Sequence, residues 1–193
     1  MVIAEKQLDI PVVQVDLASR EQHEGRFQDL NPHRTVPVLE LDTGQVLTSS
    51  TAIAHYLDAV FPEPALIGTT AEEKGKVIDL DWRIENEGFL AVGEAFRNRA
   101  KSFANNALTG KYEYPQIPAL VDRGGVRTVR FFEWLNELLA TGEYVAGDRF
   151  SLADITAFVT VEFAQWIKQH PAPELSHLHR WYKQVSERDS ARV

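Results

Sequence analysis

The sequence contains no cysteine among its 193 residues. Disulfide bonds, zinc–thiolate sites and a cysteine nucleophile are therefore excluded within these residues. It also has no apolar run close to the ~18 residues that a transmembrane helix needs. No basic segment followed by an apolar stretch marks a secretory signal. These absences predict a cytoplasmic protein without a membrane partner.

Positive charge is scarce as well, with 20 Lys and Arg against 28 Asp and Glu and a formal net charge of −8. Nucleic-acid binding requires clustered basic side chains at the phosphates, so we expect no nucleic-acid partner. The sequence has no H-E-x-x-H, Walker A or G-x-G-x-x-G motif. His177 and His179 stand two positions apart and would not share a helix face. We therefore expect no bound metal.

The segment NPHRTVPVLELDTGQVLTSSTAIAHYLDAVF, residues 31–61, is the most informative part of the sequence. Two short apolar runs, residues 36–41 and 46–48, flank the loop D-T-G-Q, in which glycine can take a positive φ. This pattern predicts a β-hairpin. Apolar side chains with helical spacing follow the hydroxyl-rich T-S-S, and Pro62 ends the predicted helix.

Pro37 and the serine pair make this segment a candidate binding corner. A proline at the start of a strand cannot donate to the ladder, and a cis bond before Pro37, which is a minority state, would leave the backbone of Val36 free for a ligand. Ser49 and Ser50 stand at the start of the predicted helix, where hydroxyl and N–H groups can bind a carboxylate or phosphate. Alternatively, Ser50 only caps the helix. Arg34 is either a second anion ligand or a solvated loop charge.

The rest of the chain is predicted to be helical. Residues 63–70 are rich in Pro and Gly, which is typical of a linker. Residues 72–99 and 119–139 then carry apolar side chains in steps of three and four. Gly124 and Gly125 lower helix propensity, so a start near residue 126 is an alternative.

Ser151 and Asp154 predict the start of a further helix. Ser151 is suited to cap it, and a carboxylate three residues later can return a hydrogen bond to the cap. The apolar side chains that follow predict that this helix forms the core of the second half of the chain. We therefore interpret Asp154 as a structural acid and not as a catalytic one.

In combination, these patterns resemble the glutathione transferases, in particular those of bacterial type. N-P-x-x-x-V-P-V-L, the D-x-G hairpin, V-L-T-x-S-x-A-I and Y-L, within residues 31–57, resemble the glutathione-binding half. EKQLDIPVVQVDL, residues 5–17, resembles the end of the first helix and the second strand. YVAGDRFSLADI, residues 144–155, resembles the start of the buried C-terminal helix, and residues 180–190 resemble the closing helix. The resemblance covers nearly the whole chain.

The resemblance implies an α/β domain of thioredoxin-like fold over residues 1–62, a linker over residues 63–70 and an all-helical domain over residues 71–193. In the family, a strand and a loop precede the first helix, and the loop supplies the Ser, Tyr or Cys that activates the thiol. This sequence begins within that helix. We therefore expect the first strand and this loop to be missing, with Met1 an internal methionine or the chain cut, and we assign no catalytic residue.

Loss of the first strand would leave residues 12–17 as a strand without its parallel partner. A two-stranded hairpin is marginal on its own, and unpaired backbone groups need other partners. We therefore expect the first 60 residues to be weakly folded. Strong amide-exchange protection of residues 12–15 would contradict this expectation.

The resemblance also implies glutathione as co-substrate and attack of its thiolate on a small electrophile, as in detoxification. The backbone of Val36, before Pro37, would pair with the cysteinyl part of glutathione. Ser50 would hold the γ-glutamyl carboxylate. Ser49 stands where the family usually has Glu or Gln, which weakens the grip on the glutamyl amine. Thr35 stands where many members have Lys or Gln, so the ligand of the glycyl carboxylate is poorly accounted for.

The resemblance places the electrophile between the two halves, beside residues 72–99. Phe89 and Phe96 would be its walls, or would belong to the core. Arg83 and Arg97 would meet an acidic substrate, or pair with glutamates of their own helix. Family membership further implies a homodimer. The alternatives are a non-catalytic protein-interaction module of the same fold and an all-helical binding domain that ignores glutathione.

Overall fold

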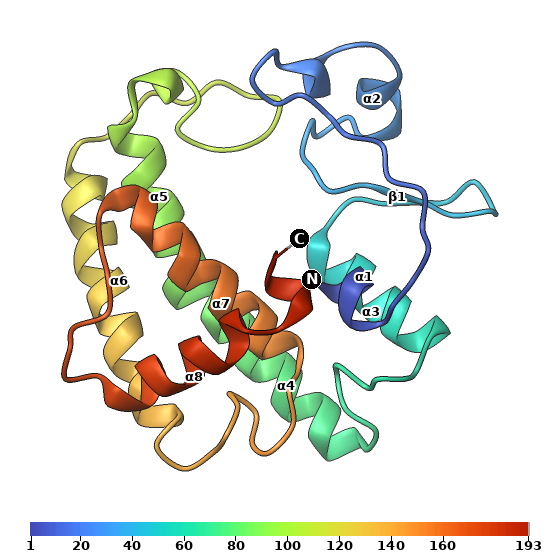
Figure 1. Ribbon diagram of the computed structural model, residues 1–193. Coiled ribbons are helices and arrows are strands. Elements are labelled where there is room, and N and C mark those ends of the chain that lie inside the picture. Colours follow the sequence, from blue (N-terminus) through green and yellow to red (C-terminus); the bar gives the residue numbers. More distant parts are fainter. Residues whose placement is uncertain (193) are drawn as a thin grey trace.

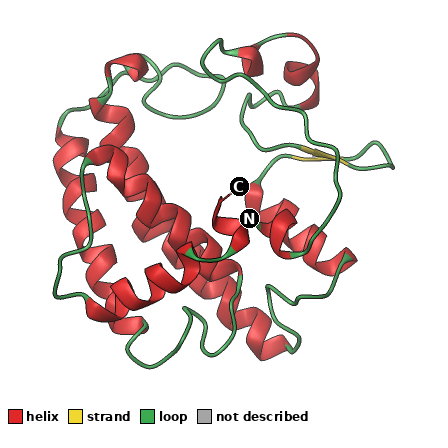
Figure 2. Cartoon of the chain, viewed as in Figure 1, coloured by secondary structure: helices red, strands yellow, loops and turns green. Residues whose placement is uncertain are grey.

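Figure 1 shows the computed structural model of the chain, which describes residues 1–192. The first part contains α1 (Val2–Glu5), η1 (Glu21–His23), α2 (Gly25–Leu30), β1 (Leu39–Glu40), β2 (Val46–Leu47) and α3 (Ser50–Val60). The second part contains α4 (Ala71–Ile84), the π-helical turn η2 (Glu85–Phe89), α5 (Leu90–Arg99), η3 (Lys101–Phe103), α6 (Ala119–Leu138), α7 (Leu152–Ala164), η4 (Gln165–Ile167), α8 (Ser176–Ser186) and η5 (Asp189–Arg192). Strands occur in the first part, and helices build the second (Figure 2).

The predicted hairpin is confirmed. β1 and β2 pair antiparallel, with Leu39 opposite Leu47. Gly44 in the connecting loop has a φ of 82°, a conformation that glycine adopts without the steric cost of a Cβ atom. The hairpin leads directly into α3, so the apolar runs and the loop residues determine this part of the fold locally.

Residues 12–17, predicted to be a strand, form none. Val12 and Val13 are 76% and 83% exposed. In the part of the chain that the structure describes, β1 and β2 make the one sheet, and neither pairs with this segment. The strand prediction was wrong because β propensity produces a strand only where a neighbouring strand supplies hydrogen bonds and packing.

The helical predictions are confirmed, with one addition. α4, η2 and α5 follow one another without a break, where residues 72–99 were predicted to be helical, but the π-helical turn in the middle was not foreseen. α7 is buried on most of its surface, as expected for the core of the second part. Its apolar side chains pack with those of α4, α5, α6 and α8 in one cluster.

α6 begins at Ala119, so the alternative start near residue 126 is wrong. Gly124 lies where α6 crosses α5. A Cβ atom added to Gly124 would stand 2.6 Å from the carbonyl oxygen of Ala91 and 2.8 Å from the backbone nitrogen of Ala95. Glycine at position 124 lowers the helix propensity of α6, but the absence of a Cβ atom there allows α5 and α6 to approach each other closely.

We expect Gly124→Ala to lower the free energy of unfolding by about 1–3 kcal/mol, because the new methyl group overlaps the α5 backbone. Gly125→Ala is the matched control. Its Cβ atom would meet only the flexible amide end of Gln169, at 3.1 Å, so we expect no loss and a gain of up to about 1 kcal/mol from helix propensity. Urea unfolding followed by circular dichroism measures both. Equal stability of the two variants would contradict the close approach.

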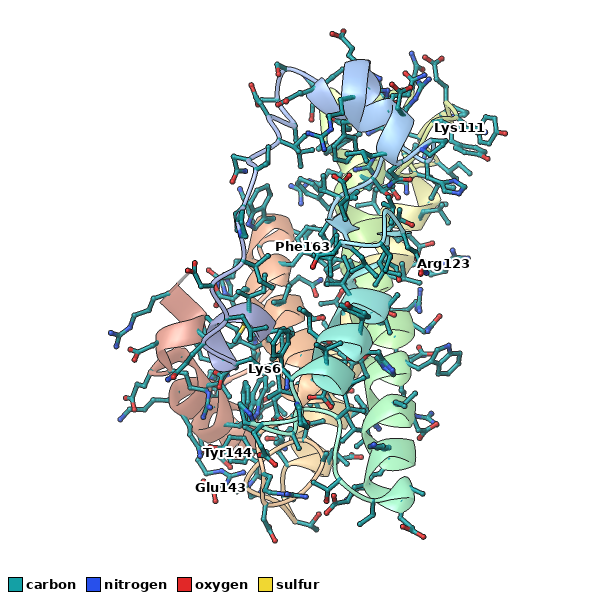
Figure 3. The ribbon with its side chains drawn as sticks, turned by 90° about the vertical axis from the view of Figure 1, so that its right-hand side faces the viewer. Lys6, Lys111, Arg123, Glu143, Tyr144 and Phe163 are labelled. Atoms are coloured by element: carbon teal, nitrogen blue, oxygen red, sulfur yellow. The ribbon has the colours of Figure 1, made fainter. Side chains whose placement is uncertain are left out.

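Lys6, at the end of α1, is a buried ammonium group that holds the first part together. Its Nζ atom donates to the carbonyl oxygens of Phe61 and Pro64, each at 2.7 Å, and lies 2.7 Å from Oδ1 of Asp58. Asp58 in turn accepts the N–H group of Leu66 at 2.9 Å. In Figure 3, Lys6 lies between α1 and α3. This one side chain therefore joins α1, the end of α3 and the segment that leads to α4.

The two ends of the described chain lie side by side (Figure 1). Nε and Nη2 of Arg188 donate to the two carboxylate oxygens of Glu5, at 2.8 and 2.7 Å. The hydroxyl of Ser190 also donates to Glu5. Arg188, which directly precedes η5, thus joins this end of the described chain to α1 by a bidentate ion pair, the strongest geometry for arginine and a carboxylate.

Candidate functional site

The predicted site residues meet at one end of the hairpin. Val36 and Ser50 each lie three residues beyond the Leu39–Leu47 pair, one before β1 and the other after β2. Because the strands are antiparallel, both positions are at the same end of the sheet. Val36, Pro37, Ser49 and Ser50 are all exposed. The hairpin thus presents an open corner to solvent.

Val36 has a backbone that is free to bind. The Val36–Pro37 peptide bond is cis. Neither the N–H nor the C=O group of Val36 forms a hydrogen bond with any of residues 1–192. A free pair of this kind can take up an extended peptide as a strand edge does.

Asn31 holds the loop that leads to Val36. The side chain of Asn31 is buried, and its Nδ2 atom donates to the carbonyl oxygen of Thr35 at 2.7 Å and to the Thr35 hydroxyl at 3.0 Å. Its Oδ1 atom accepts the N–H group of His33 at 3.0 Å. Sequence reasoning included Asn31 in the motif but did not foresee this role. Thr35 is consequently turned toward Asn31.

The N-terminus of α3 forms the other side of the corner. Ser49 is the N-cap residue, and its hydroxyl accepts the N–H group of Ala52 at 3.1 Å. The alternative in which Ser50 caps the helix is therefore wrong. The Ser50 hydroxyl and the N–H groups of Ser50 and Thr51 have no hydrogen-bond partner within the described chain. Free N–H groups at a helix N-terminus attract anions such as carboxylates.

Arg34 fits neither predicted role well. It is half-buried, with a φ of 60°, and its Nη1 atom lies 3.4 Å from Nδ1 of His23. Burial lowers the pKa of His23, and the charges of Arg20 and Arg34 lower it further. Arg34 therefore packs against η1 rather than pointing into solvent.

Aromatic side chains from four elements, η2, α5, α7 and η4, gather on the helical part. Phe163 of α7 lies 5.4 Å from Phe89 and 5.5 Å from Phe96, measured between ring centroids. Trp166 packs edge-on against Phe96 at 5.4 Å and remains 70% exposed. Phe89 and Phe96 thus lie at the edge of the core, where such a cluster can bind an apolar or aromatic molecule.

Arg97 holds a loop, contrary to both predictions for it. Its guanidinium group donates to the carbonyl oxygens of Asn106, Ala107 and Leu108, at 2.5 to 3.2 Å, and lies over the ring of Phe103. Burial lowers its pKa. Arg97 therefore fixes the segment between α5 and α6. Arg83 is exposed, and no ion pair within residues 1–192 includes it.

Asp154 is structural, as predicted. Its carboxylate accepts the backbone N–H groups of Ser151 and Val145, each at 2.9 Å, and Nε1–H of Trp181 at 2.8 Å. The Ser151 hydroxyl lies 2.9 Å from it as well. Burial raises the pKa of Asp154, while these donors act in the opposite direction. The sequence indicated the bond to Ser151 but not those to Val145 and Trp181.

Neither the cavities nor the acidic and histidine side chains of the described residues form a second candidate site. Hollows of about 300 and 330 Å³ lie beside the start of α4 and between the ends of α5 and α6, away from the corner. Over residues 1–192, no cluster of three or more His, Asp or Glu side chains is arranged to hold a metal ion. None of the described helices is long and apolar enough to cross a membrane.

Comparison with known proteins identifies both parts of the chain. The family model described as "Glutathione S-transferase, N-terminal domain" matches residues 1–60, and "Glutathione S-transferase, C-terminal domain" matches residues 118–184. Glutathione S-transferase 2 of Saccharomyces cerevisiae is 32% identical over 192 residues, which cover 98% of this chain and 80% of that protein. Glutathione S-transferase GstB of Escherichia coli is 28% identical over 97% of this chain and 86% of its own length.

Solved structures agree with these matches. A glutathione S-transferase domain-containing protein of Marinobacter aquaeolei has a TM-score of 0.88 and 33% identity, covering 98% of this chain and 91% of its own. Gtt2 of Saccharomyces cerevisiae also has a TM-score of 0.88, with 31% identity, covering 99% and 90%. The fold is thus a small thioredoxin-like domain followed by an all-helical domain, as the sequence implied. The chain belongs to the glutathione S-transferase family.

Proposed function

We propose that the protein binds glutathione at the corner formed by Val36 and Ser50 and promotes attack of the glutathione thiolate on a small electrophile. The relatives named glutathione S-transferases support a transferase role. The observation that carries the proposal is the meeting of a free Val36 backbone with an open helix N-terminus at one end of the hairpin. We place this activity in the cytoplasm, with detoxification as its role.

The cysteinyl backbone and the γ-glutamyl carboxylate of glutathione have counterparts at this corner. The Val36 backbone pairs with the cysteinyl residue, which places the thiol beside Pro37. The Ser50 hydroxyl and the N–H groups at the start of α3 bind the γ-glutamyl carboxylate, since a helix N-terminus favours negative charge. Thr35 lies beside the glycyl end. A free thiol has a pKa near 8.5, and only its thiolate is an effective nucleophile, so catalysis requires stabilisation of the negative sulfur.

The aromatic cluster is the proposed surface for the electrophile. Phe89, Phe96, Phe163 and Trp166 supply apolar faces and edges that can stack against a small unsaturated molecule. Their partial exposure supports a binding role in addition to packing. No metal takes part in this proposal.

We further propose that residues 1–62 are the glutathione-binding domain, residues 63–70 the linker and residues 71–193 the helical domain, and that two copies form a homodimer. Exposed apolar side chains on α4, namely Ile78 and Trp82, support a self-association surface. They lie four residues apart on one face of the helix.

Calorimetric titration of glutathione into the wild-type protein and the Ser50→Ala variant tests the proposal. We expect saturable binding by the wild type and about tenfold weaker binding by the variant, because a hydrogen bond to a charged group is worth about 1.5–3 kcal/mol. Ser176→Ala is the matched control, since Ser176 is also exposed and is the first residue of a helix, α8. Absence of binding by the folded wild type would contradict the proposed function.

A further inference from the structure

Residues 100–117, between α5 and α6, form a loop that reaches across to the first part of the chain, and we call this loop the strap. In Figures 1 and 3, which show the molecule from two directions, the strap lies beside α2, and Figure 3 labels Lys111 there. A Cβ atom added to Gly110 would stand 3.4 Å from the carbonyl oxygen of His33. The strap therefore lies against the loop that leads to Val36, with space for no more than one further carbon atom between them.

Arg97, in the last turn of α5, holds the near half of the strap. Its guanidinium group donates to the carbonyl oxygens of Asn106, Ala107 and Leu108, at 2.5 to 3.2 Å. No ion pair within residues 1–192 includes Arg97, so these carbonyl oxygens take the place of a carboxylate partner. Because the guanidinium fork is planar and rigid, it fixes the path of the chain beyond α5.

Hydrogen bonds across the strap close its base and leave a tight tip. Nε2 of Gln116 donates to the carbonyl oxygen of Arg97 at 2.7 Å. The N–H group of Tyr114 donates to the carbonyl oxygen of Asn105 at 2.8 Å. Gly110, in the tip, has a φ of 114°, which residues with a side chain rarely adopt. The tip thus has a defined backbone structure that is anchored on α5.

The loop that receives the strap is held from inside by Asn31. The Oδ1 atom of Asn31 accepts the N–H group of His33 at 3.0 Å, and its Nδ2 atom donates to the carbonyl oxygen of Thr35 at 2.7 Å. His33 is therefore held by Asn31 through its N–H group and meets Gly110 at its carbonyl oxygen. Since Thr35 directly precedes Val36, a displacement of this loop would also displace the Val36 backbone.

The strap also contacts the aromatic cluster. Phe103, in η3, packs edge-on against Phe96, with 5.4 Å between the ring centroids. The guanidinium carbon of Arg97 lies 4.2 Å from the centroid of the Phe103 ring, a cation–π contact that stabilises both side chains. The strap thus extends from the proposed surface for the electrophile to the proposed corner for glutathione.

We propose that the strap, with Arg97 as its anchor, positions the backbone of Val36 for glutathione binding. The helical domain would in this way hold the loop around His33 in the shape that the corner requires. The assignment rests on the proposed function, because it concerns glutathione binding at this corner. Arg97 acts through the strap and through His33, so it is a positioning residue and not a catalytic one.

Two alanine variants test the contact at the tip. Gly110→Ala strains the backbone and adds a methyl group beside the carbonyl oxygen of His33, and we expect it to bind glutathione about five- to tenfold more weakly than the wild type. Gly147→Ala is the matched control. Gly147 has a φ of 135° and forms a bridge with Tyr144 in another loop of the helical domain, and its Cβ atom would meet only Nζ of Lys76, at 3.9 Å. We expect this variant to retain wild-type affinity in calorimetric titration.

Arg97→Met tests the anchor of the strap. Methionine donates nothing to the three carbonyl oxygens, so we expect about fivefold weaker glutathione binding, and Arg97→Lys is expected to recover part of the affinity. Amide NMR spectra supply a local signature. In Arg97→Met we expect the N–H signals of His33, Thr35 and Val36 to shift, while those of α8 stay in place. Arg99→Met, at an exposed position of the same helical turn, is the control and should change neither affinity nor these signals.

The outcomes separate the two proposals. If the folded wild type does not bind glutathione, the proposed function fails and the role of the strap fails with it. If the wild type binds but Gly110→Ala and Arg97→Met bind equally well, only the role of the strap is overturned. Equal weakening by Gly110→Ala and Gly147→Ala would also overturn it, because backbone strain away from the corner would then be sufficient. If Arg97→Met does not fold, the comparison of the two glycine variants decides.

Discussion

Replacing Asp154 with alanine is expected to lower the free energy of unfolding by at least about 3 kcal/mol, because each buried donor left without a partner costs about 1–3 kcal/mol. The variant leaves the N–H groups of Val145 and Ser151 and Nε1–H of Trp181 without a hydrogen-bond acceptor. All three lie in the core of the helical domain, around the start of α7. A loss of this size is a large fraction of the stability of a typical domain.

Two companion variants make the test specific. Asp154→Asn keeps an acceptor oxygen for Val145 and Trp181 and is expected to lose less stability than Asp154→Ala. Asp148→Ala removes an exposed carboxylate from the preceding loop and should change stability by no more than about 0.5 kcal/mol. Urea unfolding followed by tryptophan fluorescence measures all three. An alanine variant at position 154 that loses less than about 1 kcal/mol of stability relative to the wild type would contradict the role of this carboxylate.

Replacing Lys6 with methionine is expected to destabilise the protein by about 3–5 kcal/mol, the cost of breaking a buried ion pair by removing one partner. The change leaves the Asp58 carboxylate buried without its cation and the carbonyl oxygens of Phe61 and Pro64 without their donor. Methionine has a similar length, so the effect arises from charge and hydrogen bonding rather than from lost volume.

The double variant Lys6→Met/Asp58→Asn separates charge from packing. Because it removes both charges together, we expect it to be more stable than Lys6→Met alone, and a double-mutant cycle measures this coupling. Lys74→Met, at an exposed position of α4, is the control and should leave stability nearly unchanged. If Lys6→Met and Lys74→Met have the same unfolding midpoint, the buried pair does not stabilise the fold.

The elements that the sequence predicted correctly are those determined by neighbouring residues. The hairpin follows from two apolar runs around Gly44, and the start of α7 follows from the spacing of Ser151 and Asp154. Both signals require only local geometry. The segment of residues 12–17 failed for the opposite reason, since its strand character depends on a partner strand that its own side chains do not specify.

The same distinction between local and long-range determinants applies to the candidate site. Val36, Pro37, Ser49 and Ser50 belong to one short stretch, and their meeting at the end of the hairpin could be predicted. The gathering of Phe89 and Phe96 around Phe163 could not, because it depends on the packing of α7 against helical turns that lie far earlier in the chain. The π-helical turn that carries Phe89 has no simple periodic signal in the sequence.

The clasp between Glu5 and Arg188 has a consequence for the order of events during translation. The carbonyl partners of Lys6 lie 55 and 58 residues further along the sequence, whereas Arg188, the partner of Glu5, lies 183 residues further along. At about 5–20 residues per second, this second partner emerges roughly 10–40 s after Glu5. During synthesis, Lys6 can therefore bind the end of α3 early. The ion pair between Glu5 and Arg188 can form only when nearly all of the helical domain has been made.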